Sequence, residues 1–172
     1  MDSVFSVWLV PQEEKELSKI VKNLAQRYDS PAFIPHLTLL GGTTINFDNL
    51  RSTIDEVFED ERPFVIKKTK LNQSKLFFKT VFIEFELSDT LKKLFLELSK
   101  KTDKIGLENF KPHISLIYKL MPEDEKIRII ENLDVKNNFI VDSAYIVSPK
   151  KGDADFLDVE GWRVLYKKSL NS

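Results

Sequence analysis

The sequence predicts an α+β fold with two pseudo-symmetric lobes, each an antiparallel-rich β-sheet with helices packed outside, around a central cleft. Three observations lead to this expectation. Strand-like and helix-like segments alternate along the chain, their order repeats after 76 or 77 residues, and one short motif occurs once in each half. The 172 residues can bury enough surface for a single domain with its own core. We expect lobes at approximately 1–75 and 76–172, with an exchange of terminal strands as an open alternative.

The first half alternates strands and helices. Residues 4–10 are rich in β-branched and aromatic side chains and end at Pro11, as a strand does. Helices are expected at 12–28, where apolar residues recur with helical spacing, and at 46–60, where Asn46 is a suitable N-cap. Further strands are expected at 34–40, 63–72 and 76–87.

The same order returns in the second half. Ser88 and Asp89 can cap a helix with a basic last turn, and Gly106 can close it. Another helix is expected at 122–133, with three acidic residues in its first turn. Strands are expected at 112–118, 139–147 and 161–168. We interpret this repetition as a duplication about an approximate two-fold axis, which places equivalent strand residues face to face where ligand clefts form.

The composition excludes several classes of function. With 26 Lys and Arg against 27 Asp and Glu, the chain lacks the basic excess of proteins that bind extended nucleic acids. The absence of cysteine excludes disulfides, thiol catalysis and cysteine-ligated metals. No signal peptide and no apolar run of about 20 residues is found. We expect a soluble, cytoplasmic monomer that does not contact membranes.

Both histidines of the chain lie in the repeated motif, Phe-x-Pro-His-[Leu/Ile]-[Thr/Ser]-Leu-[Leu/Ile]. Because side chains alternate along a strand, His36 and Thr38 point to one face, as do His113 and Ser115. Each lobe therefore offers an imidazole and a hydroxyl about 7 Å apart. A single His-x-Thr is more often structural, but a duplicated motif that uses every histidine favours a shared site.

Two imidazoles that flank one phosphate form a complete acid–base pair, since one can take a proton from water while the other protonates the leaving oxygen. We therefore predict His36 and His113 as catalytic residues, with Thr38 and Ser115 donating hydrogen bonds to the phosphate oxygens. Such a pair predicts a bell-shaped pH profile around about 6.5. Zinc would need a third ligand, which neither motif contains, so we expect no metal and no other cofactor.

In these motifs the sequence resembles the two-histidine (2H) phosphoesterases, which are marked by paired His-x-[Thr/Ser] motifs on two pseudo-symmetric lobes. Within that superfamily it resembles the plant- and yeast-type cyclic phosphodiesterases. Residues 6–11 are similar to the opening strand of that branch, 77–82 to its central aromatic strand, and 113–118 to its second motif with the following tyrosine.

The resemblance implies hydrolysis of small cyclic phosphates. The substrates it implies are ADP-ribose 1″,2″-cyclic phosphate, a product of tRNA splicing chemistry that would yield ADP-ribose 1″-phosphate, and nucleoside 2′,3′-cyclic phosphates, which would yield 2′-phosphates. The partner expected is thus a small cyclic phosphate or nucleotide. An RNA end-processing enzyme related to 2′-5′ RNA ligases and a non-catalytic nucleotide-binding module are the alternatives.

The resemblance also implies that Trp8, Phe78 and Tyr118 line the nucleoside side of the cleft as substrate-binding residues. Core packing is the alternative for Trp8 and Phe78. Tyr118 has the opposite strand parity to His113, so it reaches the cleft only if the strand bends at its end.

Overall fold

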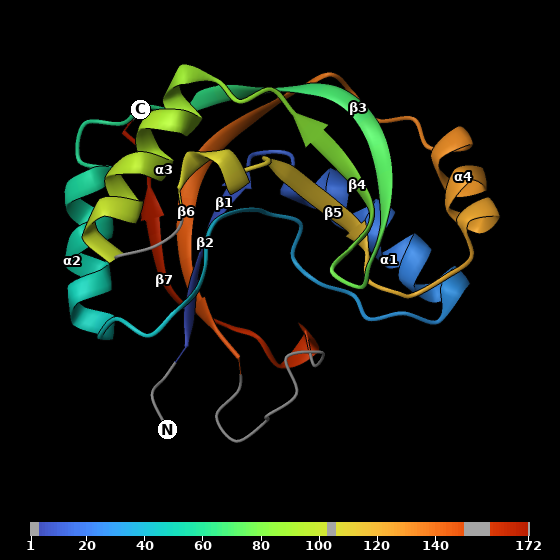
Figure 1. Cartoon of the computed structure of the whole chain (residues 1–172), viewed down its shortest axis with the longest axis horizontal. Coiled ribbons are helices and arrows are strands. Elements are labelled where there is room, and N and C mark those ends of the chain that lie inside the picture. The colour runs from blue at the N-terminus through green and yellow to red at the C-terminus, as the bar shows by residue number, and fades with distance from the viewer. Residues whose placement is uncertain (1–3, 103–105, 150–158, 172) are drawn as a thin grey trace.

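The computed structural model describes residues 4–102, 106–149 and 159–171. In these ranges seven strands form one antiparallel sheet and four α-helices cover it (Figure 1). This confirms the α+β class. The elements are β1 (Phe5–Pro11), α1 (Glu14–Tyr28), β2 (Leu37–Thr43), α2 (Phe47–Val57), β3 (Phe64–Leu76), β4 (Lys79–Phe85), α3 (Asp89–Thr102), η1 (Leu107–Asn109), β5 (His113–Ile117), α4 (Glu123–Glu131), β6 (Asn138–Ser148), η2 (Val159–Gly161) and β7 (Arg163–Ser169).

The strand pairing has the two-fold pattern that the sequence repeat predicts. The sheet order is β1-β2-β5-β4-β3-β6-β7, and β1 also pairs with β6, so the first six strands form a closed cycle of pairings. Exchanging β1 with β4, β2 with β5 and β3 with β6 leaves this cycle unchanged. The strand β7 extends the sheet beyond β6, and among the residues described no strand takes the equivalent place beside β3.

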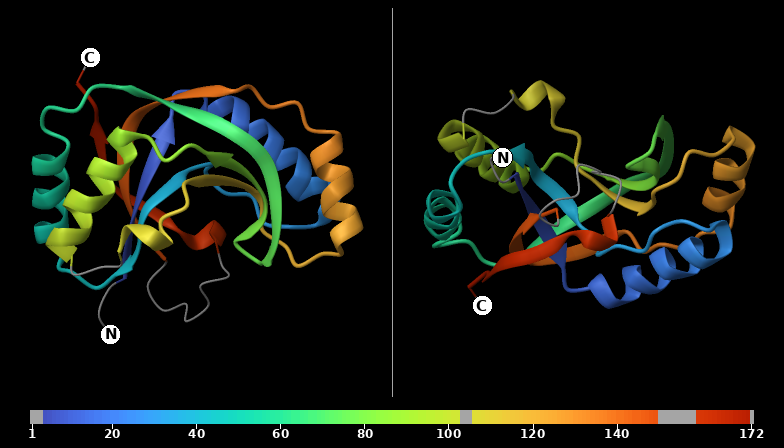
Figure 2. Two further views of the ribbon diagram at one scale, coloured as in Figure 1. Left: turned by 45° about the horizontal axis from the view of Figure 1, so that its top comes forward. Right: turned by 90° about the horizontal axis from the view of Figure 1, so that it is seen from below.

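Helices from each half of the chain pack on strands of the other half. The helix α1 packs on β5 and α4 on β3 and β4, whereas α3 packs on β2 and α2 on α3 and β7. Figures 1 and 2 show these pairs of helices at opposite ends of the molecule, with the strands between them. The lobe boundaries expected at 1–75 and 76–172 stay a prediction, and these contacts cross the boundary between them. Each half sends a helix to cover a strand of the other half, so neither half closes its core alone.

Local sequence explains the elements that carry the site. The strand β1 is buried along its whole length because it pairs with β2 on one side and β6 on the other. Asn46 caps α2 as predicted, and its side chain accepts hydrogen bonds from the backbone of Asp48 and Asn49. None of the helices in the ranges described is long and apolar enough to cross a membrane.

Candidate active site

The two motif strands meet at equivalent residues. β2 and β5 pair through Leu37 and Ile114, which occupy the same position in the two motifs and are both fully buried. Because neighbouring side chains on a strand point to opposite faces, the residues that flank this pair all turn away from the core. These residues are His36, Thr38, His113 and Ser115. The pseudo-two-fold axis thus passes through the point where both motifs meet.

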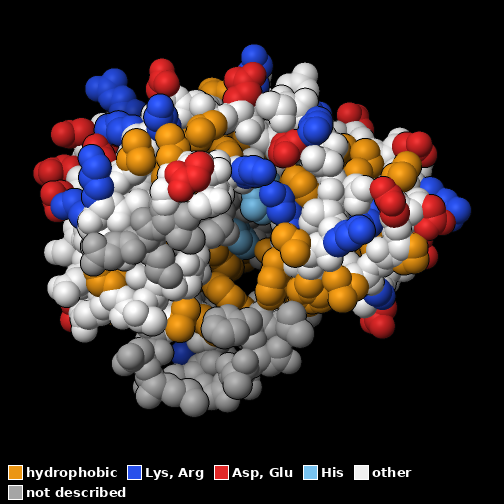
Figure 3. Space-filling model, in the orientation of Figure 1, with side chains coloured by type: hydrophobic (Ala, Val, Ile, Leu, Met, Phe, Trp, Pro, Cys, Tyr) orange, Lys and Arg blue, Asp and Glu red, His pale blue; other side chains and the backbone are white. Residues whose placement is uncertain are grey.

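These four side chains line one cavity of about 760 Å³. Trp8, Phe78 and Tyr118 line it too, so the structure brings together all seven residues that the sequence nominated. In Figure 3 the histidines lie at the bottom of a hollow, with hydrophobic side chains gathered along one side and basic side chains at its edge.

Each imidazole is fixed through the same nitrogen. Nδ1 of His36 lies 2.5 Å from the carbonyl oxygen of Ile34, and Nδ1 of His113 lies 2.9 Å from that of Lys111. A carbonyl oxygen only accepts hydrogen bonds, so Nδ1 carries a proton in both rings. Nε2 of each neutral ring is then the nitrogen left to take up a proton.

The environments of the two imidazoles differ. His36 is only 7% exposed and stacks on Trp8, with ring centroids 3.5 Å apart. Burial lowers the pKa of His36 to about 3, although the Ile34 carbonyl opposes this effect. His113 meets the edge of Phe82 at 5.5 Å, and burial lowers its pKa as well. Because burial lowers the pKa of both rings, we expect the pH profile of the free protein to lie below the ordinary histidine pKa of about 6.5.

The hydroxyl groups of Thr38 and Ser115 have different surroundings. Ser115 donates a hydrogen bond of 2.7 Å to the carbonyl of Phe78, at the turn between β3 and β4. It must rotate this proton away from that carbonyl to donate to a bound phosphate. Thr38 lies opposite Trp8 in the pairing of β2 with β1. Both hydroxyls share the face of the histidines and line the same cavity.

An aromatic wall closes one side of the cavity. Tyr118 follows the last residue of β5, where strand parity no longer holds, and this explains how it reaches the cleft. Its ring stacks on Phe33 at 3.7 Å and meets Phe78 edge-on at 5.2 Å. Phe78 is 40% exposed, whereas Trp8 is 7% exposed. Phe78 therefore offers an open ring surface, whereas Trp8 is buried between His36, Trp162 and an apolar cluster.

Sequence reasoning missed Phe33 and Trp162, which also line the cavity. Phe33 begins the first motif, but its counterpart Phe110 stacks on Phe95 of α3 instead. The motif alone gives no signal that distinguishes the two. Trp162 lies nearly parallel to Trp8, with ring centroids 5.5 Å apart, and the sequence indicated only that it belongs to the strand expected at 161–168.

Within the ranges described, no group of three or more His, Cys, Asp or Glu side chains comes together as a metal site. The two histidines, the two hydroxyls and the surrounding aromatic rings line this cavity, together with Ser6, Glu14, Ser18 and Lys22. Proton transfer and hydrogen bonding to an anion are the chemistry that this set supports.

The chain is similar to known proteins in sequence and in fold. A family model described as cyclic phosphodiesterase-like protein matches residues 1–167. A cyclic phosphodiesterase of Arabidopsis thaliana is 22% identical over 125 residues, which cover 72% of this chain and 69% of that protein. The structure of E. coli LigT with 3′-AMP aligns with a TM-score of 0.60 over 100% of both chains, at 12% identity. LigT with NADP⁺ aligns with a TM-score of 0.58 over 99% of both chains, at 12% identity.

Proposed function

The chain belongs to the family of cyclic phosphodiesterase-like proteins, the 2H phosphoesterases, and we propose that it opens a cyclic phosphate carried on adjacent ribose hydroxyls. One observation carries the proposal. His36 and His113 occupy equivalent positions of two motifs whose strands pair at Leu37 and Ile114, and each has Nδ1 held by a backbone carbonyl. Such a pair is suited to concerted proton donation and acceptance at a single phosphorus.

The proposed reaction consumes one water molecule. The neutral imidazole takes a proton from water as the water oxygen bonds to phosphorus, and the charged imidazole protonates the ribose oxygen whose bond to phosphorus breaks. The products are a phosphomonoester and a free ribose hydroxyl. Thr38 and Ser115 donate hydrogen bonds to the non-bridging oxygens, where negative charge is held during the displacement.

The proposed substrates are ADP-ribose 1″,2″-cyclic phosphate and nucleoside 2′,3′-cyclic phosphates, which would yield ADP-ribose 1″-phosphate and nucleoside 2′-phosphates. The cavity volume of about 760 Å³ lies in the range of small-molecule sites. The exposed ring of Phe78 and the Tyr118–Phe33 stack provide apolar surface for the nucleoside part. Solved complexes of LigT hold 3′-AMP, ATP and NADP⁺, which supports nucleotides as ligands of this fold.

A substrate panel in the presence of EDTA tests the proposal. The panel contains 2′,3′-cyclic nucleotides, ADP-ribose 1″,2″-cyclic phosphate and short RNAs that end in a 2′,3′-cyclic phosphate. We expect turnover of the small cyclic phosphates and its loss in His36→Ala and His113→Ala. Turnover of the RNAs alone would replace this proposal with RNA end processing. Ligand binding without any turnover would indicate the non-catalytic module.

A further inference from the structure

The pseudo-two-fold axis relates the surroundings of the two histidines residue by residue. Trp8 on β1 pairs with Thr38, and Phe82 on β4 pairs with Ser115, so Trp8 and Phe82 are equivalent. Both are aromatic, and each contacts the histidine of its own lobe. The two halves of the site are therefore matched at this position.

The match ends two residues further along each strand. Glu84 on β4 pairs directly with His113. Val10 is the equivalent residue of β1. Leu9 pairs with Leu37, so the next step of this antiparallel register places Val10 beside His36. Val10 packs in a small apolar cluster. One histidine thus has an apolar neighbour where the other has a carboxylate.

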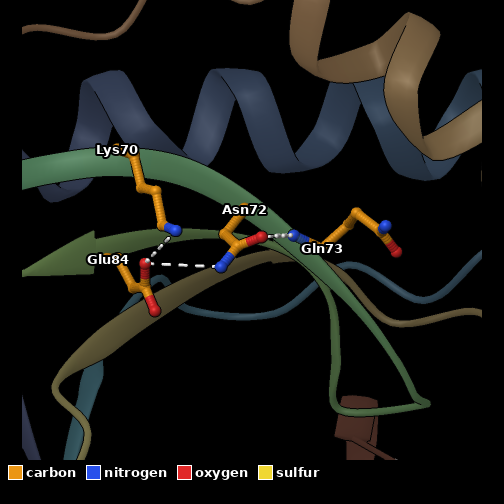
Figure 4. A network of polar contacts seen from close by, with 4 residues as sticks. All are labelled: Lys70, Asn72, Gln73 and Glu84. Carbon is orange, nitrogen blue, oxygen red and sulfur yellow. Dashed lines mark hydrogen bonds and ion pairs between the residues drawn. The ribbon is translucent and has the colours of Figure 1, made fainter.

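The carboxylate of Glu84 is held in place by β3 (Figure 4). Asn72 donates a hydrogen bond of 3.3 Å to Oε2 of Glu84, and the ammonium of Lys70 lies 3.7 Å from the same oxygen. The backbone N–H of Gln73 donates to Oδ1 of Asn72 at 2.9 Å, which fixes the amide so that its nitrogen faces Glu84. The Glu84 side chain is 26% exposed, so its charge acts on His113 through a partly desolvated region.

Other charged groups also act on His113. Lys79 reaches over the ring of Phe82, with its ammonium 4.6 Å from the centroid. After burial and the Lys111 carbonyl, Lys79 lowers the pKa of His113 and Glu84 raises it. For His36, by contrast, the charge that acts is that of His113 on the facing motif strand. Side-chain charges that favour or oppose a proton on the ring are thus concentrated on the His113 side.

We propose that Glu84 is a positioning residue that favours the charged form of His113. The assignment of roles rests on the hydrolysis proposed above. His113 gives its proton to the leaving ribose oxygen as the bond from phosphorus to that oxygen breaks. His36, beside Val10, takes a proton from the attacking water as the new bond to phosphorus forms. Solvent then returns one proton to His113 and removes one from His36.

NMR titration of the imidazoles tests this assignment without substrate. The chain has only two histidines, so single variants assign their ring signals. Opposed residues on paired strands have Cβ atoms about 5 Å apart, and charges roughly 6 Å apart at an effective dielectric constant of about 40–80 change a pKa by about 0.5–1. We expect Glu84→Gln to lower the pKa of His113 by that amount and Lys79→Gln to raise it. The pKa of His36 should move by less than about 0.2.

Glu86→Gln is the matched control, because Glu86 forms an ion pair of 3.4 Å with Lys67, next to the pair formed by Glu84 and Lys70. It should leave the pKa of His113 unchanged. Retention of the wild-type His113 pKa in Glu84→Gln would overturn the proposal, as would an equal change in Glu86→Gln. A shift of His36 instead of His113 would also overturn it.

Kinetics separate this proposal from the proposed function. With a 2′,3′-cyclic nucleotide, Glu84→Gln should move the alkaline limb of kcat/KM to lower pH by the change measured by NMR, while the acidic limb stays in place. If the wild-type protein turns over no cyclic phosphate, the proposed function is wrong. The titration still decides whether Glu84 favours the protonated form of His113. If turnover is present and the alkaline limb does not move in Glu84→Gln, the proposed proton-donor role of His113 is wrong.

Discussion

Acidification should destabilise the protein through His36. Its pKa is about 3 in the fold because the ring is buried, against about 6.5 in an unfolded chain. As the pH falls below 6.5, the unfolded chain binds a proton that the folded chain excludes, so stability is lost progressively down to about pH 3. Between pH 7 and pH 4 the difference extends over about 2.5 pH units, and at 1.36 kcal/mol per unit it amounts to about 3 kcal/mol.

Urea unfolding of the wild type and of His36→Gln at pH 7, 6, 5 and 4 measures this effect. Other groups contribute equally to both proteins, including Glu13, whose pKa is lowered by a backbone hydrogen bond and by Lys136 against the effect of burial. Their contributions cancel in the difference between the two free energies of unfolding. Relative to His36→Gln, the wild type should lose about 3 kcal/mol of unfolding free energy between pH 7 and pH 4. A difference that stays constant within about 0.5 kcal/mol would refute the reasoning, because His36 would then titrate alike in both states.

Four further results are expected. His36→Ala and His113→Ala should each lower turnover of a cyclic phosphate by about 10²-fold or more. The double variant should lose little more activity than the less active single variant. Near wild-type turnover in either single variant would show that the substituted histidine takes no part in the mechanism. Activity should survive exhaustive EDTA treatment, and rescue of a chelated, inactive protein by zinc or manganese would contradict this. Thr38→Ala and Ser115→Ala should each lower kcat/KM by roughly 10-fold without changing the shape of its pH profile. Thr38→Ser should lower it less, because it keeps the hydroxyl donor. Full activity in both alanine variants would show that these hydroxyls are only structural. Finally, kcat/KM should fall as the pH rises through the pKa of His113, which burial places below the ordinary 6.5, and a flat profile from pH 5 to 9 with rate-limiting chemistry would contradict acid–base catalysis.

The elements could be predicted from the sequence more readily than their assembly. The apolar stripe of 12–28 correctly indicated a helix with Leu17, Val21 and Leu24 buried. An apolar stripe shows that one face of a helix is buried but not which strand buries it. The packing of α1 on β5, in the other half of the chain, therefore could not be predicted from the sequence. The strands expected at 34–40 and 112–118 begin later in the structure, at Leu37 and His113. Pro35 and Pro112 precede these starts, and proline has no N–H to donate to a strand pair.

The site was predictable where it depended on strand parity and unpredictable where it depended on register. Parity alone placed the motif histidines and hydroxyls on common faces. Phe78 and Phe82 have the same parity in the strand expected at 76–87, and only the pairing of β4 with β5 places Phe82 beside the second motif, where it contacts His113. The same pairing places Glu84 beside that histidine. Trp162 reaches Trp8 across the fold, which no local pattern could indicate.

Phosphorus NMR of a nucleoside 2′,3′-cyclic phosphate incubated with the protein in EDTA tests the two-histidine mechanism most directly. The wild type should convert the cyclic phosphate signal into a single 2′-phosphomonoester signal. His36→Ala and His113→Ala, both shown to be folded, should leave the cyclic signal unchanged on the same timescale. Conversion by either variant at the wild-type rate would contradict the account, since the reaction would then proceed without one of the two proton carriers.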